Sequence, residues 1–191
     1  MSIRNALAAV IAAGFAWFAP YGAAAQAGGS ENPPLKGLFQ DNFTLLNPPA
    51  PAPQTAFTDA AGQARRLGDF AGRVVLLNFW ATWCAPCVRE LPTMDRLQAR
   101  LGGEGLAVVA VSWDRGGLAV VEPFLAELGI EHLDIYLDTP GRTGPEFGVR
   151  GLPTTFLIDR QGRMVGGMEG PAEWDSPEAE ALIRHYLARG G

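Results

Sequence analysis

The sequence predicts one α/β domain, a three-layer sandwich of helices around a mixed central sheet. Two near-continuous apolar runs, at residues 74–80 and 106–113, are typical of strands that are covered on both faces. A segment with the pattern of a helix follows each run. Near the C-terminus, two strand patterns are separated by a short turn, which indicates an antiparallel hairpin and therefore a sheet that is not purely parallel.

The first half of the domain is predicted to contain a hairpin, a buried strand and a long helix. The elements are, in order, a strand at 54–58, a turn at 59–62, a return strand at 63–66, one helical turn at 67–70, a strand at 74–80 and a helix at 85–101. Gly102 and Gly103 end the long helix, and Pro92 inside it should produce a kink.

The second half alternates strands and helices before the chain closes on an amphipathic helix. The elements are a strand at 106–113, a helix at 118–128, a strand at 133–137, a short helix at 143–147, hairpin strands at 154–158 and 164–168, and a helix at 176–187. Ser176 is the expected N-cap of the last helix, because Ser accepts hydrogen bonds from free N–H groups and Pro177 suits the first turn.

The N-terminal residues 1–25 are predicted to be a secretory signal peptide. Arg4 precedes an apolar stretch, and small residues at Ala23 to Ala25 suit cleavage by a signal peptidase. The alternative is an uncleaved membrane anchor, since the stretch nearly reaches the roughly 20 residues that span a bilayer. Gly14 and Pro20 interrupt the stretch, which favours cleavage. No cysteine follows it, so a lipid anchor on cysteine is excluded.

Residues 26–53 are predicted to form a linker before a catalytic domain at 54–191. The linker is rich in Pro and Gly, and such a density of proline disfavours both helices and sheet ladders. Its apolar side chains can dock on the domain. They are Leu35, Leu38, Phe39, Phe43, Leu45 and Leu46.

Charge and composition exclude some classes of function. The formal net charge is −5 and the pI is about 5.0, and Lys and Arg are scattered rather than clustered. The sequence therefore has no basic surface pattern for a nucleic-acid partner.

Cys84 and Cys87 are the only cysteines of the chain, and they lie one helical turn apart at the start of the predicted helix. A structural disulfide is the ordinary use of cysteines in an exported protein, but a loop this short restrains the unfolded chain little. A zinc site lacks ligands, because no second cysteine pair exists and His132 and His185 are far apart in sequence. Thiol–disulfide chemistry is the interpretation that remains.

Two motifs resemble exported thioredoxin-like disulfide reductases of the TlpA/ResA type. The first runs from Asn78 to Cys87 with the sequence NFWATWCAPC, and the second from Gly151 to Asp159 with the sequence GLPTTFLID. The resemblance extends from about residue 54 to the C-terminus. It implies a thioredoxin-like sandwich with an N-terminal hairpin and a helix–strand insertion.

Cys84 is the predicted nucleophile, because the positive end of a helix dipole favours its thiolate. Cys87, on the next turn, is predicted to resolve the mixed disulfide that Cys84 forms with a substrate. Ala85 and Pro86 offer no cationic side chain, and Pro86 lacks an N–H that would stabilise the thiolate. The motif therefore favours a reductant over an oxidant.

The substrate surface is predicted to lie around Trp83 and Pro86 and the segment formed by Leu152, Pro153 and Thr154. The resemblance implies that the peptide bond before Pro153 is cis and faces the disulfide. Leu152 would then offer its backbone to an extended substrate strand. Trp83 is expected beside the disulfide, whereas Trp80 is expected in the core.

Glu90 is the third predicted catalytic residue, since it lies on the turn after Cys87 and matches a glutamate of the TlpA/ResA motif. Ordinary thioredoxins carry an aspartate at the place that Asn78 occupies here. A buried carboxyl at Glu90 would take the proton of Cys87 and oppose thiolate formation. The alternative is a solvated helix charge paired with Arg89 or Arg96.

The sequence thus predicts a periplasmic thiol:disulfide reductase whose only redox group is the Cys84–Cys87 pair, with no other cofactor and no metal site. The resemblance suggests substrates in cytochrome c or copper-site maturation, and export implies that a membrane thiol transporter supplies electrons. Two alternatives stay open. One is an oxidant or isomerase of the same fold, and the other is a copper chaperone with Met94 or a histidine as third ligand.

Overall fold

The computed structural model of the protein describes residues 32–189. The predicted signal peptide or anchor at 1–25 and the start of the predicted linker lie outside these residues. Within 32–189, no helix combines the length and the apolar character needed to cross a bilayer.

Eight strands form one mixed sheet in the order β1-β8-β7-β4-β5-β6-β2-β3. Strand β4 pairs in parallel with β5 and antiparallel with β7, and β7 and β8 form the predicted antiparallel hairpin. The strands are β1 (Thr44–Pro51), β2 (Phe57–Asp59), β3 (Ala64–Arg65), β4 (Val74–Trp80), β5 (Leu106–Ser112), β6 (Tyr136–Leu137), β7 (Thr154–Ile158) and β8 (Arg163–Glu169). The helices are α1 (Leu38–Asn42), α2 (Ala85–Leu101), α3 (Leu118–Glu127), α4 (Thr143–Glu146) and α5 (Pro177–Leu187), with 3-10 turns η1 (Leu67–Phe70) and η2 (Gly102–Glu104).

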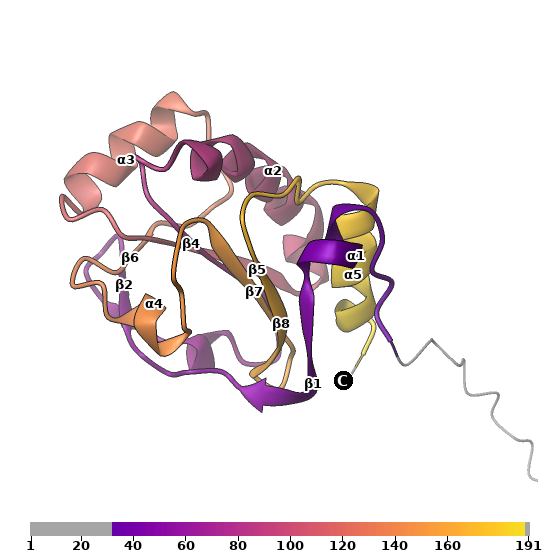
Figure 1. The fold of residues 1–191 in the computed structure, drawn as a ribbon. Helices are drawn as coiled ribbons and strands as arrows, with labels where there is room; N and C mark the ends of the chain where they lie inside the picture. The colour runs from indigo at the N-terminus through magenta and orange to yellow at the C-terminus, as the bar shows by residue number, and fades with distance from the viewer. Residues whose placement is uncertain (1–31, 190–191) are drawn as a thin grey trace, which may run out of the picture. The chain divides into compact units, whose positions relative to one another are not determined.

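Helices lie on both faces of the sheet, which gives the three layers (Figure 1). Successive side chains of a strand point to opposite faces. Along β4, Val74 and Leu76 pack in one core cluster with side chains of α1, α2 and α5. Val75 and Leu77 pack in another with side chains of η1 and with Phe147, the C-cap of α4. The predicted α/β class with a mixed sheet is therefore confirmed.

Helix α5 begins where the sequence predicts, because the Ser176 hydroxyl accepts a hydrogen bond from the Ala179 N–H at 3.3 Å. Strand β6 is shorter than the predicted 133–137. The N–H of Leu133 donates to the buried Asp95 carboxylate at 3.1 Å instead of to a neighbouring strand. The pairing of β6 therefore starts only at Tyr136.

The predicted linker is wrong for residues 38–51, which form α1 and the edge strand β1. Phe39 and Phe43 are buried, so the expected docking of the apolar side chains is confirmed for them. Strand β1 pairs with β8, and the ladder is irregular between Leu45 and Ala50. An edge strand tolerates proline because one of its sides needs no ladder bonds, which is why this Pro-rich segment can still pair.

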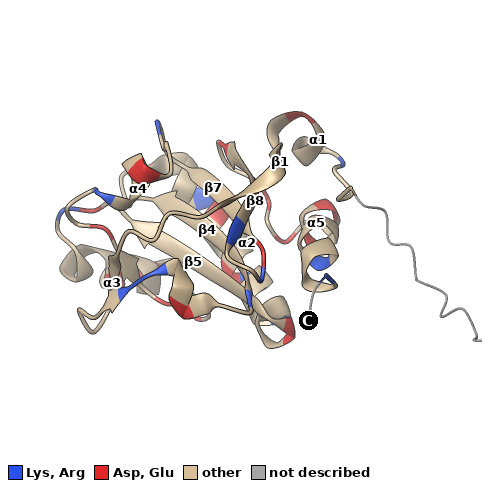
Figure 2. Ribbon diagram, turned by 90° about the horizontal axis from the view of Figure 1, so that it is seen from below, with Lys and Arg blue, Asp and Glu red and all other residues tan. Residues whose placement is uncertain are grey.

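The close approach of β1 to β8 depends on Gly166. A Cβ atom there would lie 2.5 Å from a ring carbon of Phe43 and 2.5 Å from the carbonyl oxygen of Thr44. Acidic and basic residues are interspersed along the ribbon (Figure 2). Exposed pairs such as Arg184 with Glu104 at 2.5 Å are of the kind that contributes little to stability.

Candidate active site

The two cysteines form a disulfide at the N-terminus of α2, just after the end of β4. Cys84 is the N-cap of α2, and its Sγ accepts a hydrogen bond from the Cys87 N–H at 3.3 Å. Cys84 is 6% exposed and Cys87 is fully buried. An attacking group from solvent therefore reaches Cys84 first, and its sulfur lies at the positive end of the α2 dipole.

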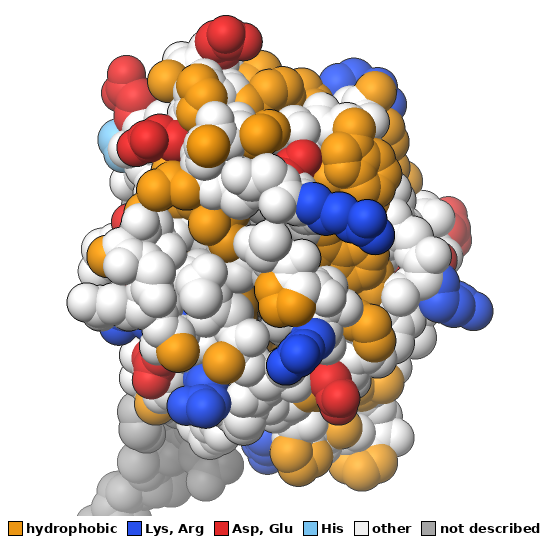
Figure 3. All heavy atoms as spheres, turned by 90° about the vertical axis from the view of Figure 1, so that its left-hand side faces the viewer, with side chains coloured by type: hydrophobic (Ala, Val, Ile, Leu, Met, Phe, Trp, Pro, Cys, Tyr) orange, Lys and Arg blue, Asp and Glu red, His pale blue; other side chains and the backbone are white. Residues whose placement is uncertain are grey.

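Trp83 projects from the surface next to the disulfide, with 69% of its area exposed. Trp80 is buried against Phe124 of α3, as the sequence predicts. Only three large hydrophobic side chains in the described part of the chain are exposed: Leu38, Trp83 and Val120. Figure 3 shows the face that carries α3 and α4, where hydrophobic side chains gather in patches with basic side chains between them.

The peptide bond between Leu152 and Pro153 is cis, as the resemblance implies. Leu152 is partly buried and packs against the core cluster that contains Cys84 and Cys87. The Thr154 hydroxyl donates to the Gly151 carbonyl at 2.7 Å and closes the turn before β7.

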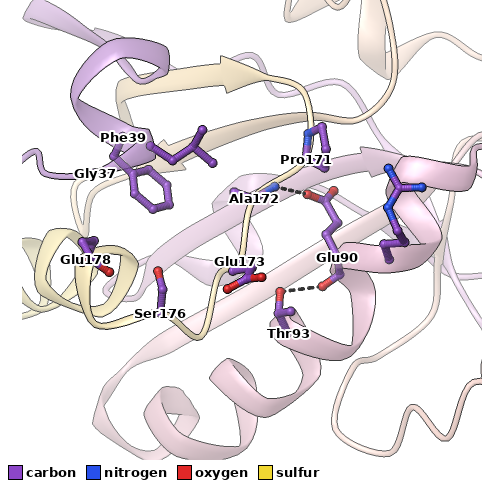
Figure 4. Close-up of a pocket in the computed structure, with 11 residues that line it drawn as sticks. Gly37, Phe39, Glu90, Thr93, Pro171, Ala172, Glu173, Ser176 and Glu178 are labelled. Atoms are coloured by element: carbon purple, nitrogen blue, oxygen red, sulfur yellow. Dashed lines mark hydrogen bonds between the residues drawn. The ribbon is translucent and has the colours of Figure 1, made fainter.

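Glu90 lies in the interior, with 2% of its area exposed. Its Oε2 accepts a hydrogen bond from the Ala172 N–H at 3.1 Å (Figure 4) and another from the Trp174 indole N–H at 3.3 Å. Burial raises the pKa of the Glu90 carboxyl to about 7, and the hydrogen bonds that it accepts only partly oppose this shift. The alternative of a solvated helix charge is therefore wrong, and Arg96 pairs with Asp175 instead.

Asn78 joins Glu90 to the sheet. It shares the face of β4 that carries Val74 and Leu76, so its side chain points toward α2. Its Nδ2 donates to Glu90 Oε1 at 2.8 Å and to the Thr155 hydroxyl at 2.9 Å.

A cavity of about 550 Å³ opens beside Glu90. Figure 4 shows the lining residues converging from α1, α2 and the segment before α5, with the Glu90 side chain directed toward Ala172. The cavity brings the surface close to a carboxyl whose charge state changes near neutral pH. Its lining includes Phe39, Arg89, Glu90, Thr93, Ala172 and Glu173.

Sequence reasoning missed the partners of Glu90 and one further buried acid. Ala172 and Trp174 are more than 80 positions from Glu90 in sequence, and no local pattern indicates the contact. Asp114 comes directly after a predicted buried strand, where a loop side chain is ordinarily solvated, yet it is buried and bonded to Thr82. Its position directly after a buried strand was the available signal, because side chains there gather at the edge of a sheet where sites form.

The described residues contain no group of three or more His, Cys, Asp and Glu side chains placed to hold a metal ion. Met94, a candidate third copper ligand, is fully buried in the core cluster between the sheet, α1 and α5, whereas the cysteines belong to a different cluster.

Comparison with known proteins decides the family. The sequence matches the AhpC/TSA family over residues 48–166. The chain belongs to the AhpC/TSA family. Thiol-disulfide oxidoreductase ResA of Bacillus thuringiensis subsp. konkukian (strain 97-27) is 35% identical over 136 residues, which cover 70% of this chain and 78% of that protein. The ResA protein of Bacillus subtilis (strain 168) is 33% identical over 136 residues, covering 71% of this chain and 72% of that protein.

Solved structures agree with this assignment. A putative thiol:disulfide interchange protein DsbE from Chlorobium tepidum is 36% identical, with a TM-score of 0.66 over 73% of this chain and 96% of that one. StoA from Bacillus subtilis is 25% identical, with a TM-score of 0.57 over 72% of this chain and 98% of that one. This member of the AhpC/TSA family is thus a thioredoxin-like thiol-disulfide oxidoreductase whose cysteine pair is Cys84 and Cys87.

Proposed function

We propose that the protein is an exported reductase of protein disulfides, in which Cys84 is the nucleophile, Cys87 the resolving thiol and Glu90 the proton acceptor. The observation that carries this proposal is the buried Glu90 carboxyl, one turn beyond Cys87 on α2, with a pKa of about 7. A carboxylate there disfavours a stable thiolate on Cys87. A dithiol whose thiolates are not stabilised gives up its electrons more readily, so the pair acts as a reductant.

The reaction begins with the reduced pair. The Cys84 thiolate attacks one sulfur of a substrate disulfide, and the other substrate sulfur leaves as a thiolate. Cys87 then loses its proton and attacks Cys84, which breaks the mixed disulfide and releases the second substrate thiolate. Two electrons pass to the substrate, whose sulfurs take up two protons. The enzyme ends with the Cys84–Cys87 disulfide seen in the structure.

Glu90 fits the role of proton acceptor for Cys87. A base works best when its pKa lies near the working pH, and a pKa of about 7 meets that condition. The two side chains are three residues apart on one helix and therefore share a face. The cavity beside Glu90 gives the proton a route to water.

The substrate lies, in this proposal, across Trp83 and the turn formed by Leu152, Pro153 and Thr154. Trp83 provides an exposed aromatic surface, and the backbone before β7 provides main-chain hydrogen bonds to an extended strand. Pro86 lies in the first turn of α2 between the two cysteines and completes this surface. Recognition through backbone atoms accepts many sequences.

The compartment and partners follow from the predicted signal peptide or N-terminal anchor. A reductase in the periplasm has no access to cytosolic NADPH, so a membrane thiol transporter returns two electrons to the Cys84–Cys87 disulfide after each cycle. Its substrates are disulfides of exported proteins. By analogy with the TlpA/ResA type, these include the haem-attachment cysteines of apocytochrome c and cysteines of copper sites.

A trapping experiment tests the proposal. The full chain with Cys87→Ser should accumulate mixed disulfides in the periplasm through Cys84, and peptide mapping should identify both the substrates and the electron donor. The matched Cys84→Ser variant should trap nothing. Equal trapping by both variants would contradict the assignment of the nucleophile.

The direction of electron flow is tested separately by equilibration with glutathione. A potential near the value of about −270 mV that thioredoxin shows supports a reductase, whereas a value near about −120 mV points to an oxidant of the same fold.

A further inference from the structure

The loop between β4 and α2 is hydrogen-bonded to a buried acidic side chain. Asp114, two residues beyond β5, is 5% exposed. Its Oδ2 accepts a hydrogen bond from the Thr82 N–H at 2.9 Å, and its Oδ1 accepts one from the Thr82 hydroxyl at 2.6 Å. One side chain thus holds both the backbone and the side chain of a residue two positions before Cys84.

Asp114 is itself held in place. The Ser112 hydroxyl donates to Asp114 Oδ2 at 2.8 Å and accepts from the Asp114 N–H at 3.0 Å. The Asp114 carbonyl also accepts from the Gly117 N–H at 3.0 Å, at the start of α3. The carboxylate therefore has fixed support on the β5 side, and the Thr82 loop is the part that it restrains.

The restrained loop presents both the nucleophile and the exposed aromatic side chain. The Cys84 N–H donates to the Ala81 carbonyl at 3.1 Å, so Ala81 to Cys84 forms one turn with Thr82 inside it. Cys84 acts as the N-cap of α2 only if this turn keeps its sulfur at the helix end, where the Cys87 N–H donates to it. Trp83 follows Thr82 directly and takes its direction from the same turn.

We propose that Asp114 is a positioning residue for thiol–disulfide exchange. It acts through Thr82 to keep the Cys84 sulfur at the N-terminus of α2. This inference rests on the proposed function in that it takes Cys84 as the nucleophile. It adds a buried acid on the β5 side of the site, separate from Glu90 on α2. Without the Thr82 hydrogen bonds, the turn loosens and the thiolate of Cys84 loses part of its N–H environment.

The test measures the pH dependence of Cys84 alkylation by iodoacetamide in the full chain. A Cys87→Ser background leaves Cys84 as the only thiol, so the alkylation rate reports on it alone. Thr82→Val removes the hydroxyl at nearly constant volume. The midpoint of the alkylation rate against pH should rise by about 0.5 to 1 pH unit, as expected for the loss of one hydrogen bond. Thr82→Ser keeps the hydroxyl and should restore the wild-type profile.

Charge cannot produce this difference, because both Thr82 variants retain Asp114 after β5 and Glu90 on α2. A double-mutant cycle adds Asp114→Ala, in which Thr82→Val should cause no further shift, since the partner of the hydroxyl is gone. Asp159→Ala is the matched control for loss of a buried aspartate. Asp159 is 6% exposed and accepts from the Gln161 and Arg163 N–H groups in a turn that follows β7, at the opposite end of β4.

Identical profiles for Thr82→Val and Thr82→Ser would overturn the proposal and leave Asp114 a structural residue. The Thr82→Val comparison stands by itself if Asp114→Ala does not fold. Failure of the proposed function has a different signature, since Cys84 would then trap no substrate even where its alkylation profile responds to Thr82.

Discussion

Asn78 on β4 donates a hydrogen bond of 2.8 Å from Nδ2 to Oε1 of Glu90 on α2. The contact lies in the interior, and both side chains are 2% exposed or less. An amide can turn either its N–H or its carbonyl oxygen toward the same neighbour. Asn78 can therefore serve an ionised Glu90 as donor and a protonated Glu90 as acceptor. Its Oδ1 has no hydrogen-bond partner within the described part of the protein, which leaves it available for that exchange.

The first prediction concerns the pH dependence of stability. The pKa of Glu90 is raised from 4.5 to about 7 by folding, so the native state binds an extra proton between these pH values. The contribution of Glu90 to the free energy of unfolding is fully present below about pH 4.5 and is lost as the pH rises through 7. Glu90→Gln removes the effect. Urea unfolding should show wild type losing about 3 kcal/mol relative to this variant between pH 4.5 and 8.

A matched control for this prediction is Glu173→Gln, because Glu173 lines the same cavity but is exposed. The free energy of unfolding of this variant should follow wild type across the pH range. A constant difference between wild type and Glu90→Gln at all pH values would show that the Glu90 carboxyl titrates normally.

The second prediction is for Asn78→Asp. This change places a second carboxyl at hydrogen-bond distance from Glu90, where both cannot ionise easily. The pair should share one proton, and its higher apparent pKa should rise above 7. Carboxyl carbon NMR titration measures this directly. Asn78→Ser, which adds no charge, serves as the control and should produce no second titrating carboxyl.

The third prediction concerns Trp83. Because its side chain is 69% exposed, Trp83→Ala should leave the unfolding free energy within about 0.5 kcal/mol of wild type. It should raise KM for a protein disulfide at least several-fold, since it removes the aromatic contact proposed for the substrate. The control is Val120→Ala, which truncates another exposed hydrophobic side chain. Equal effects of the two variants on KM would contradict the proposed contact between Trp83 and the substrate.

The sequence indicates the elements that carry strong local patterns. The apolar run of β4 and the helix 85–101 have the predicted bounds, because burial on both faces and two glycines mark them clearly. The cysteine pair and Pro153 were found through short motifs. What local sequence does not show is which distant N–H groups surround a buried side chain.

Glu90 illustrates that limit. Its helix position predicts a face shared with Cys87, but the donors Ala172 and Trp174 come from a segment that tertiary packing alone brings near. The Pro-rich segment that forms β1 illustrates a second limit of sequence-based prediction. A high proline content disfavours a central strand, yet it allows an edge strand, and only the presence of β8 as partner makes β1 form.

The last prediction tests whether α1 is part of the folded domain and of the site. Phe39 is 2% exposed, its ring centroid lies 5.3 Å from that of Trp174, and it lines the cavity beside Glu90. Phe39→Ala should cost about 3–5 kcal/mol of unfolding free energy in urea titrations. Because burial is the main cause of the raised pKa of Glu90, water admitted by the truncation should also lower that pKa from about 7 toward its ordinary value, as carboxyl NMR titration would show. Val120→Ala, at an exposed position that does not line this cavity, should change neither quantity. A wild-type titration of Glu90 in Phe39→Ala would show that α1 does not shield the carboxyl.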